Sequence, residues 1–327
     1  MDNQRSNVVL IDWLSFTTTL YCAEELIDVL GLNGLSWETT FGTRGYQNRY
    51  YFDGISIHFN GGVNMGVWCE MSGQGCRAFE SFGDGNFNKL FELILAQNKQ
   101  FHITRIDIAY DDYDGILDIT TLSRHTLNKH FRSKWNYNEV IQSTNGISIQ
   151  VGSSKSDSLV RIYDKLSERL SKIRNDKEKE KVKDAIPHWI RVELQLRDDR
   201  AKEFIRYIVA DEKPIGQVYS GVVRNYLEYG SFYTSKNGTE KFKTYSYWEK
   251  FLSHSEKLTL FVTPGVDYNL SNCINYVTNC AGNAVDCLMK IYGLEAFKKL
   301  IDKRSVEQNP KYQDLINKYN SKKKGCL

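Results

Sequence analysis

Three segments of the sequence place charged and phenolic side chains at every second position, the spacing that puts them on one face of a β-strand. The segments are residues 104–112, 159–165 and 190–197. Their polar faces together hold carboxylates, cations and one phenol: Asp107, Asp111, Glu193, Arg105, Arg161, Lys165, Arg191, Arg197 and Tyr163. The intervening positions are mostly apolar, so each strand is expected to bury its opposite face.

If the three strands are neighbours in one sheet, this combination suits a reaction at a phosphodiester. Carboxylate oxygens are the ligands preferred by Mg²⁺ or Mn²⁺. Arginine and lysine bind phosphate, and tyrosine can act as a covalent nucleophile. A simpler interpretation is that the polar faces are solvated and joined by cross-strand ion pairs. Tyr163 is also only one of 20 tyrosines, most of which must serve packing or the surface.

The same segments resemble the trans-acting replication initiators of Gram-positive rolling-circle plasmids and the related relaxases of conjugative transposons. The resemblance lies in residues 104–112, 160–165 and 189–197, with further similarity at 11–17 and 71–77. It implies site-specific nicking and rejoining of one DNA strand, with Tyr163 as the nucleophile. The products would be a 5′-phosphotyrosyl intermediate and a free 3′-OH, from which rolling-circle replication can start.

The resemblance and the residue chemistry together suggest a role for each candidate. Tyr163, Lys165 and Arg161 are expected to be catalytic, with the two cations favouring the phenolate. Asp107 and Glu193 are expected to bind Mg²⁺ or Mn²⁺, with Asp111 or Asp112 as a further ligand. The expected DNA-binding residues are Arg105, Arg191, Arg197, Arg77, Lys172 and Lys179.

Other nickases hold metal through a His-hydrophobic-His motif, and the six histidines of this chain include no such pair. A carboxylate site is therefore expected, with His188 either assisting it or lying at a strand end. The glycines of Gly73-x-Gly75, followed by Arg77, either let the backbone approach a DNA phosphate or form a tight turn.

The segments that carry these residues are expected strands separated by expected helices. This succession predicts an α+β fold with an antiparallel sheet. Two cycles of strand, helix, strand, strand and helix indicate either an internal pseudo-duplication or the ordinary succession of an antiparallel α+β protein. We divide the chain into an N-terminal half (1–100), a catalytic half (101–215) and a mainly helical region (216–327) with a basic tail. Helices are expected near residues 23–30, 86–97, 120–129, 166–185, 201–209, 245–252 and 270–293.

The charge balance constrains the class of partner. Lys and Arg total 43 against 40 acidic residues, which excludes a histone-like protein but not a DNA-binding protein with clustered cations. Positive charge is concentrated in residues 297–327, with nine basic and three acidic residues. This tail is either an arm that contacts phosphate or a disordered end.

Seven cysteines, an odd number without a CxxC motif, favour a reduced protein. We find no signal peptide and no apolar stretch of about 18 residues, so a cytoplasmic bacterial protein without membrane contact is expected. The expected partners are origin DNA, a host helicase and polymerase, and a second copy in a homodimer. The alternative function is a non-enzymatic DNA-binding regulator encoded on a mobile element.

Overall fold

The structure is a computed structural model that describes residues 7–253, 258, 260, 282–302 and 316. The chain divides into two compact units, residues 1–261 and 262–327. The second unit contains α11 (Gly282–Tyr292) and α12 (Leu294–Asp302). Most of the predicted basic tail, and residues 270–281 of the predicted C-terminal helix, lie outside the described residues. Everything below concerns the first unit.

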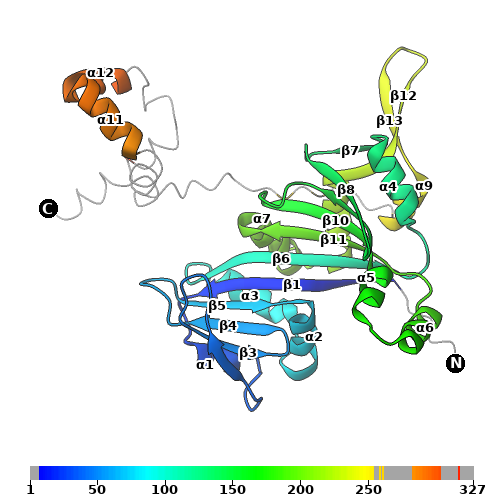
Figure 1. Cartoon of the computed structure of the whole chain (residues 1–327), viewed down its shortest axis with the longest axis horizontal. Helices are drawn as coiled ribbons and strands as arrows, with labels where there is room; N and C mark the ends of the chain where they lie inside the picture. Colours follow the sequence, from blue (N-terminus) through cyan, green and yellow to red (C-terminus); the bar gives the residue numbers. More distant parts are fainter. Residues whose placement is uncertain (1–6, 254–257, 259, 261–281, 303–315, 317–327) are drawn as a thin grey trace. The chain divides into compact units, whose positions relative to one another are not determined.

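A ten-stranded antiparallel sheet forms the centre of the first unit (Figure 1). Its strands follow the order β2-β3-β4-β5-β1-β6-β11-β10-β9-β8. Their bounds are β1 Val8–Thr18, β2 Glu38–Phe41, β3 Asn48–Phe52, β4 Ile55–Phe59, β5 Val67–Met71, β6 Phe101–Asp112, β8 Asn138–Ser143, β9 Gly146–Val151, β10 Ser158–Asp164 and β11 Ile190–Arg197. The predicted α+β class is confirmed, and the three strands with polar faces are neighbours as β6, β11 and β10.

The strand order repeats when each half of the sheet is read from its outer edge. The first half runs 2-3-4-5-1 and the second 8-9-10-11-6, so that β1 and β6 pair at the centre. Helices occupy matching places: α1 (Ala23–Val29) follows β1 and α4 (Ile119–Leu127) follows β6. Likewise α2 (Gly73–Phe82) follows β5 and α7 (Asp198–Val209) follows β11. This symmetry supports the pseudo-duplicated interpretation.

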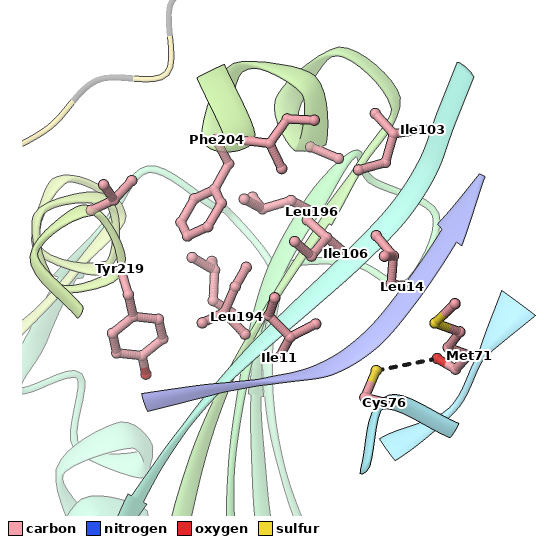
Figure 2. Close-up of a cluster of buried hydrophobic side chains, with 14 of the residues drawn as sticks. Ile11, Leu14, Met71, Cys76, Ile103, Ile106, Leu194, Leu196, Phe204 and Tyr219 are labelled. Carbon is pink, nitrogen blue, oxygen red and sulfur yellow. Dashed lines mark hydrogen bonds between the residues drawn. The ribbon is translucent and has the colours of Figure 1, made fainter. Parts of the chain in front are cut away.

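The hydrophobic core lies between the sheet and the helices that cover one of its faces. Besides α2 and α7, these include α3 (Phe87–Ala96) and α8 (Ile215–Tyr226). Figure 2 shows the alternate residues of the central strands, among them Ile106 and Leu194, packing against Phe204 of α7. The hydroxyl of Tyr219 on α8 donates to the carbonyl of Val192 at 2.9 Å. The apolar face of β11 is thereby fixed, so its polar face must point to the other side of the sheet.

Several elements differ from the sequence prediction. The charged helix expected at 166–185 is two helices, α5 (Lys165–Lys172) and α6 (Asp176–Ala185), because the Asn175 side chain accepts hydrogen bonds from the first amides of α6. The predicted helix near 245–252 is confirmed as α9 (Ser246–Phe251). No described helix has both the length and the apolar character needed to cross a bilayer.

The region predicted to be mainly helical after residue 216 also contains strands. β12 (Leu227–Thr234) and β13 (Glu240–Thr244) form a hairpin that pairs with β7 (Phe131–Ser133) in a second sheet. The hairpin turn is closed by a hydrogen bond from the Gly238 amide to the Ser235 carbonyl, and the φ of 75° at Gly238 suits a residue without a Cβ. Its pairing partner β7 is about a hundred residues earlier, and periodicity in one segment carries no information on such long-range pairing.

The Gly73-x-Gly75 motif is the first turn of α2, capped by Ser72, and not an open loop. A Cβ on Gly75 would lie 2.3 Å from the carbonyl oxygen of Gly54, in the β3–β4 turn. Glycine is therefore required at this position because the helix packs directly on backbone.

We predict that Gly75→Ala lowers the thermal unfolding midpoint, since overpacking of this kind costs about 1–3 kcal/mol. Gly216→Ala is the matched control, because Gly216 is also near the start of a helix and its Cβ would meet Val9 at an ordinary 3.6 Å. Alanine there should be neutral or stabilising by up to about 1 kcal/mol. Equal midpoints for the two variants would contradict the close packing of α2 on the β3–β4 turn.

Candidate active site

The polar faces of β6, β11 and β10 form a continuous surface because the antiparallel register aligns their outward residues in rows. Each row crosses the three strands in the order β6, β11, β10. The rows are Asp111–Arg191–Tyr163, Ala109–Glu193–Arg161 and Asp107–Gln195–Leu159, followed by Arg105–Arg197 on the first two strands. The structure therefore brings together the predicted nucleophile, the predicted metal ligands and most of the predicted arginines.

Tyr163 is the last residue but one of β10, just before the Asp164 cap of α5. Its hydroxyl donates to Glu193 Oε2 at 3.3 Å. Burial, together with the negative charge of Glu193, raises the pKa of Tyr163 well above its usual value. Lys165 Nζ lies 5.5 Å from the Tyr163 ring centroid.

Without bound metal, the cations Lys165 and Arg161 do not hold the pKa of Tyr163 at its usual value, and their part in favouring the phenolate stays a prediction for the metal-bound site. Lys165 forms an ion pair with Glu168 at 2.7 Å, and Arg161 donates to Glu193 at 3.4 Å. Because both cations are paired with carboxylates, they do not offset the burial of the phenol. Tyr163 is protonated until something takes its proton.

Asp107 and Glu193 form a buried carboxylate pair on adjacent strands. They are 3% and 6% exposed; after burial, the charge of Asp107 raises the pKa of Glu193, and the charge of Asp12 raises the pKa of Asp107. Burial contributes most to both shifts, and it raises the pKa of Glu193 to about 7. Arg105 binds both oxygens of Asp107 and stacks on the Trp13 ring, with its guanidinium carbon 4.6 Å from the ring centroid.

Arg191 is buried and joins three strands. It donates from Nε and Nη2 to the two oxygens of Asp111, each at 2.7 Å, and its Nη1 forms an ion pair with Asp12 Oδ1 at 2.7 Å. All three guanidinium nitrogens are thus committed to carboxylates of the chain. Arg191 therefore holds the site together and is not a free phosphate ligand, and Asp111 is correspondingly engaged on both oxygens.

Asp12 is a site residue that the sequence interpretation missed. On β1, Ile11 pairs with Ile108 and Trp13 pairs with Asp107, so Asp12 is one extra residue in the strand. This bulge turns its carboxylate toward Arg191. The similarity of Ile11-Asp12 to Ile106-Asp107 was the signal that could have identified it.

The remaining predicted residues lie outside this centre or have structural partners. Arg77 on α2 donates to the Ile11 carbonyl at 2.9 Å and to Glu80 at 2.8 Å. Lys172 pairs with Glu168 on α5, and Lys179 pairs with Asp176 on α6. His188 contacts Asp112, whose Oδ2 also accepts from the Leu117 amide, so this pair organises the chain after β6.

Two buried polar groups beside Asp107 have no hydrogen-bond partner among the described residues. They are both amide atoms of Gln195, which is 0% exposed, and the Trp13 indole nitrogen. Both residues are register partners of Asp107, one on each neighbouring strand. Unsatisfied groups of this kind indicate that the site is completed by a ligand or water.

The donor set fits Mg²⁺ or Mn²⁺. Two repelling carboxylates supply hard oxygen ligands, and such ions commonly take one or two carboxylates and fill their remaining positions with water and phosphate. No cluster of three or more His, Cys, Asp or Glu in the described residues is arranged to hold a metal without such help. The predicted third ligand, Asp111, has both oxygens bound by Arg191. Asp107 is likewise bound by Arg105, so an ion at this site would share Asp107 with that arginine.

The N-terminal half of the sheet lacks the corresponding chemistry. Glu193 stands four residues before the N-cap of α7, and the residue four before the N-cap of α2 is Trp68. The strand partner of Trp68 is His58, stacked on it with ring centroids 4.4 Å apart, where the other half has the Arg161–Glu193 pair. Within the described sheet, the arrangement of Tyr163, Glu193 and Arg161 therefore has no counterpart in the N-terminal half.

Two family models match the chain. The model described as Replication initiation factor matches residues 101–304, and the Rolling Circle replication initiation protein N-terminal domain matches residues 8–96. The chain belongs to the replication initiation factor family. The two matches meet near the boundary between the two halves of the sheet, and the first includes every residue of the candidate site except Asp12 and Trp13.

Two relatives extend the family comparison. The putative DNA relaxase NicK of Bacillus subtilis (strain 168) is 28% identical over 275 residues, covering 80% of this chain and 75% of that protein. The rolling circle replication initiator protein of Geobacillus stearothermophilus has a similar structure, with a TM-score of 0.66 and 28% identity. That match covers 78% of this chain and 99% of the Geobacillus chain. The structural similarity to a rolling circle replication initiator therefore agrees with the family assignment from the sequence.

We predict that Glu193→Gln stabilises the metal-free protein at pH 8 but not at pH 5. The pKa of Glu193 is raised, so the folded state binds its proton more tightly than the unfolded state does, and stability is lost as the pH rises from about 4.5 through 7. Glutamine does not titrate and so removes that loss. Above pH 7 the free energy of unfolding of the variant should therefore exceed that of the wild type by about 1–3 kcal/mol. Thermal unfolding in a chelating buffer measures it.

Glu168→Gln provides a control of opposite sign. Lys165 and Lys172 lower the pKa of Glu168 against the opposing effect of burial, so its charge stabilises the fold above its ordinary pKa. Its replacement should therefore lower the midpoint at pH 8. A midpoint for Glu193→Gln that is equal to or below that of the wild type at pH 8 would contradict a burial cost for Glu193 that exceeds the benefit of its contact with Arg161.

Proposed function

We propose that this chain nicks and rejoins one strand of origin DNA, with Tyr163 as the nucleophile. The observation that carries the proposal is the hydrogen bond from the Tyr163 hydroxyl to Glu193, on a surface that also holds Asp107 and Arg161. Because the Tyr163 phenol is protonated at neutral pH, it needs a proton acceptor, and Glu193 lies within reach.

The proposed reaction is a transesterification. As Glu193 takes the phenolic proton, the Tyr163 oxygen forms a bond to the scissile phosphorus and the bond from phosphorus to the 3′ oxygen breaks. The proton passes to that oxygen, which leaves as a 3′-OH, and the 5′ side remains as a phosphotyrosyl ester. Rejoining is the reverse: the 3′-OH attacks phosphorus and Tyr163 recovers its proton.

The cations next to Tyr163 are proposed to bind the scissile phosphate. The Arg161 side chain is 36% exposed and makes a long 3.4 Å contact with Glu193, so a phosphate can compete for it. Lys165 lies beside the ring at the first position of α5. Asp107 and Glu193 would hold Mg²⁺ or Mn²⁺, which when bound supplies positive charge to the phosphate oxygens as negative charge accumulates.

The relatives support this proposal. One is named a putative DNA relaxase and the other a rolling circle replication initiator. A nick with a free 3′-OH would serve a host polymerase and helicase in either process. A second copy of the chain would allow two origins or two strand ends to be held at once.

We predict that Tyr163→Phe abolishes the covalent protein–DNA adduct. The test uses supercoiled DNA carrying the sequence around the gene for this chain, with Mg²⁺ or Mn²⁺, followed by denaturation and electrophoresis. Tyr51→Phe is the matched control, because Tyr51 is a half-buried tyrosine in β3, in the N-terminal half of the same sheet. An adduct retained by Tyr163→Phe would disprove the assignment, and binding without nicking by the wild type would favour the regulator.

We predict that Asp107→Asn weakens Mn²⁺ binding at least about tenfold, since it removes one of the two proposed carboxylate ligands. Titration calorimetry with Mn²⁺ alone measures this independently of activity. Glu70→Gln is the control, because Glu70 is a half-buried carboxylate on β5 whose pKa burial also raises. Unchanged Mn²⁺ affinity in Asp107→Asn would exclude Asp107 as a ligand.

A further inference from the structure

The β12–β13 hairpin is a two-stranded ribbon that the proposed chemistry does not use. β12 pairs with β13 over residues 230–234, while its pairing with β7 covers only residues 227–229. In the part of the chain that the structure describes, no third strand pairs with the ribbon beyond β7, and Figure 1 shows it extending away from the large sheet. An isolated hairpin is marginally stable in water, so a ribbon kept in this form needs internal support.

One face of the ribbon supplies that support. Phe232 and Phe242 are cross-strand partners whose rings meet edge to face, with centroids 5.0 Å apart. Arg132 of β7 lies over Phe242 at 4.5 Å. A Cβ on Gly230 would lie 2.6 Å from the Phe242 ring, so glycine lets this ring cover the neighbouring strand. These contacts stiffen the ribbon at its base.

The opposite face is polar and basic. The register pairs Ser231 with Lys243 and Tyr233 with Lys241, so all four side chains share this face. Tyr233 is 48% exposed, and both lysines are exposed. A third lysine, Lys236, is in the exposed turn. Within the described residues, none of the three lysines is in an ion pair, and Glu240 is the only acidic residue from 230 to 244.

The base of the ribbon is connected to the strand that carries the nucleophile. Trp135, just after β7, stacks on Tyr226 with centroids 4.7 Å apart and donates from its indole nitrogen to Ser158 Oγ at 3.2 Å. Ser158 is the first residue of β10, five residues from Tyr163, or about 17 Å along a strand. A ligand on the ribbon would therefore be held at a defined distance from the site.

We propose that the polar face of the β12–β13 ribbon enters the major groove of duplex DNA beside the nick site. The major groove admits a two-stranded β-ribbon, and lysine, serine and tyrosine side chains can reach base edges and phosphates there. The unpaired lysines match a polyanion, whereas a ribbon used for pairing with a second copy would need neither their charge nor the exposed phenol. The proposal rests on the proposed function, because it assigns duplex DNA as the partner.

The test compares full-length wild type with Lys241→Ala/Lys243→Ala. The probes are a labelled 30-bp duplex of mixed sequence, the same duplex with its cytosines replaced by glucosylated 5-hydroxymethylcytosine to block the major groove, and the single strand. We expect the variant to bind the plain duplex about five- to tenfold more weakly, with a shallower salt dependence. Blocking the major groove should weaken duplex binding by the wild type to a similar extent. It should cause little further loss of duplex binding by the variant.

The control is Lys99→Ala/Lys202→Ala, which removes two exposed lysines outside the ribbon, one in the turn before β6 and one on α7. It should bind the plain duplex like wild type. Adduct formation on a single-stranded oligonucleotide carrying the mapped nick should be unchanged in the ribbon variant, so that failure of the ribbon proposal is separable from failure of the Tyr163 chemistry. Unchanged duplex affinity, equal loss in the control, or loss of dimerisation without loss of duplex binding would each overturn the proposal.

Discussion

The buried guanidinium of Arg191 is the interaction on which the arrangement of the site depends. It extends from β11 across β6 to β1, and the carboxylates of Asp111 and Asp12 take all three of its nitrogens. Removing one member of a buried charge network leaves another uncompensated, at a cost of about 3–5 kcal/mol. The two halves of the sheet meet between β1 and β6, so this network also joins the duplicated halves.

Burial also raises the pKa of the proposed nucleophile and of its hydrogen-bond acceptor. The Tyr163 phenol is protonated, and its nearest acceptor, Glu193, lies in a pair of carboxylates that repel each other. This is unfavourable for the fold alone, and a dication or a phosphate would relieve it. A nickase should not cut until DNA and metal are in place, so instability of the free site is consistent with its proposed task.

Much of the fold and site was predictable from local patterns. Alternation of polar and apolar residues identified β6, β10 and β11 and their outward faces, because side chains on a strand alternate strictly. Their adjacency was only a condition of the sequence interpretation, and the structure established it. The helix at 73–82 and the β12–β13 ribbon were missed, since glycine in the first turn of α2 obscured the helix and the pairing of β12 with β7 spans about a hundred residues.

The sequence by itself determined which residues are available for chemistry: the strand faces, Tyr163 as the one tyrosine on the polar faces of the three strands, and the carboxylates Asp107 and Glu193. Only the tertiary structure decided which of these residues contact one another and how deeply each is buried. It engaged Arg191 and Asp111 with each other, brought Asp12 into the site through a β-bulge, and raised the pKa of Tyr163. The physical reason is that ion pairing and desolvation depend on distances across strands far apart in sequence, which spacing along one strand cannot specify.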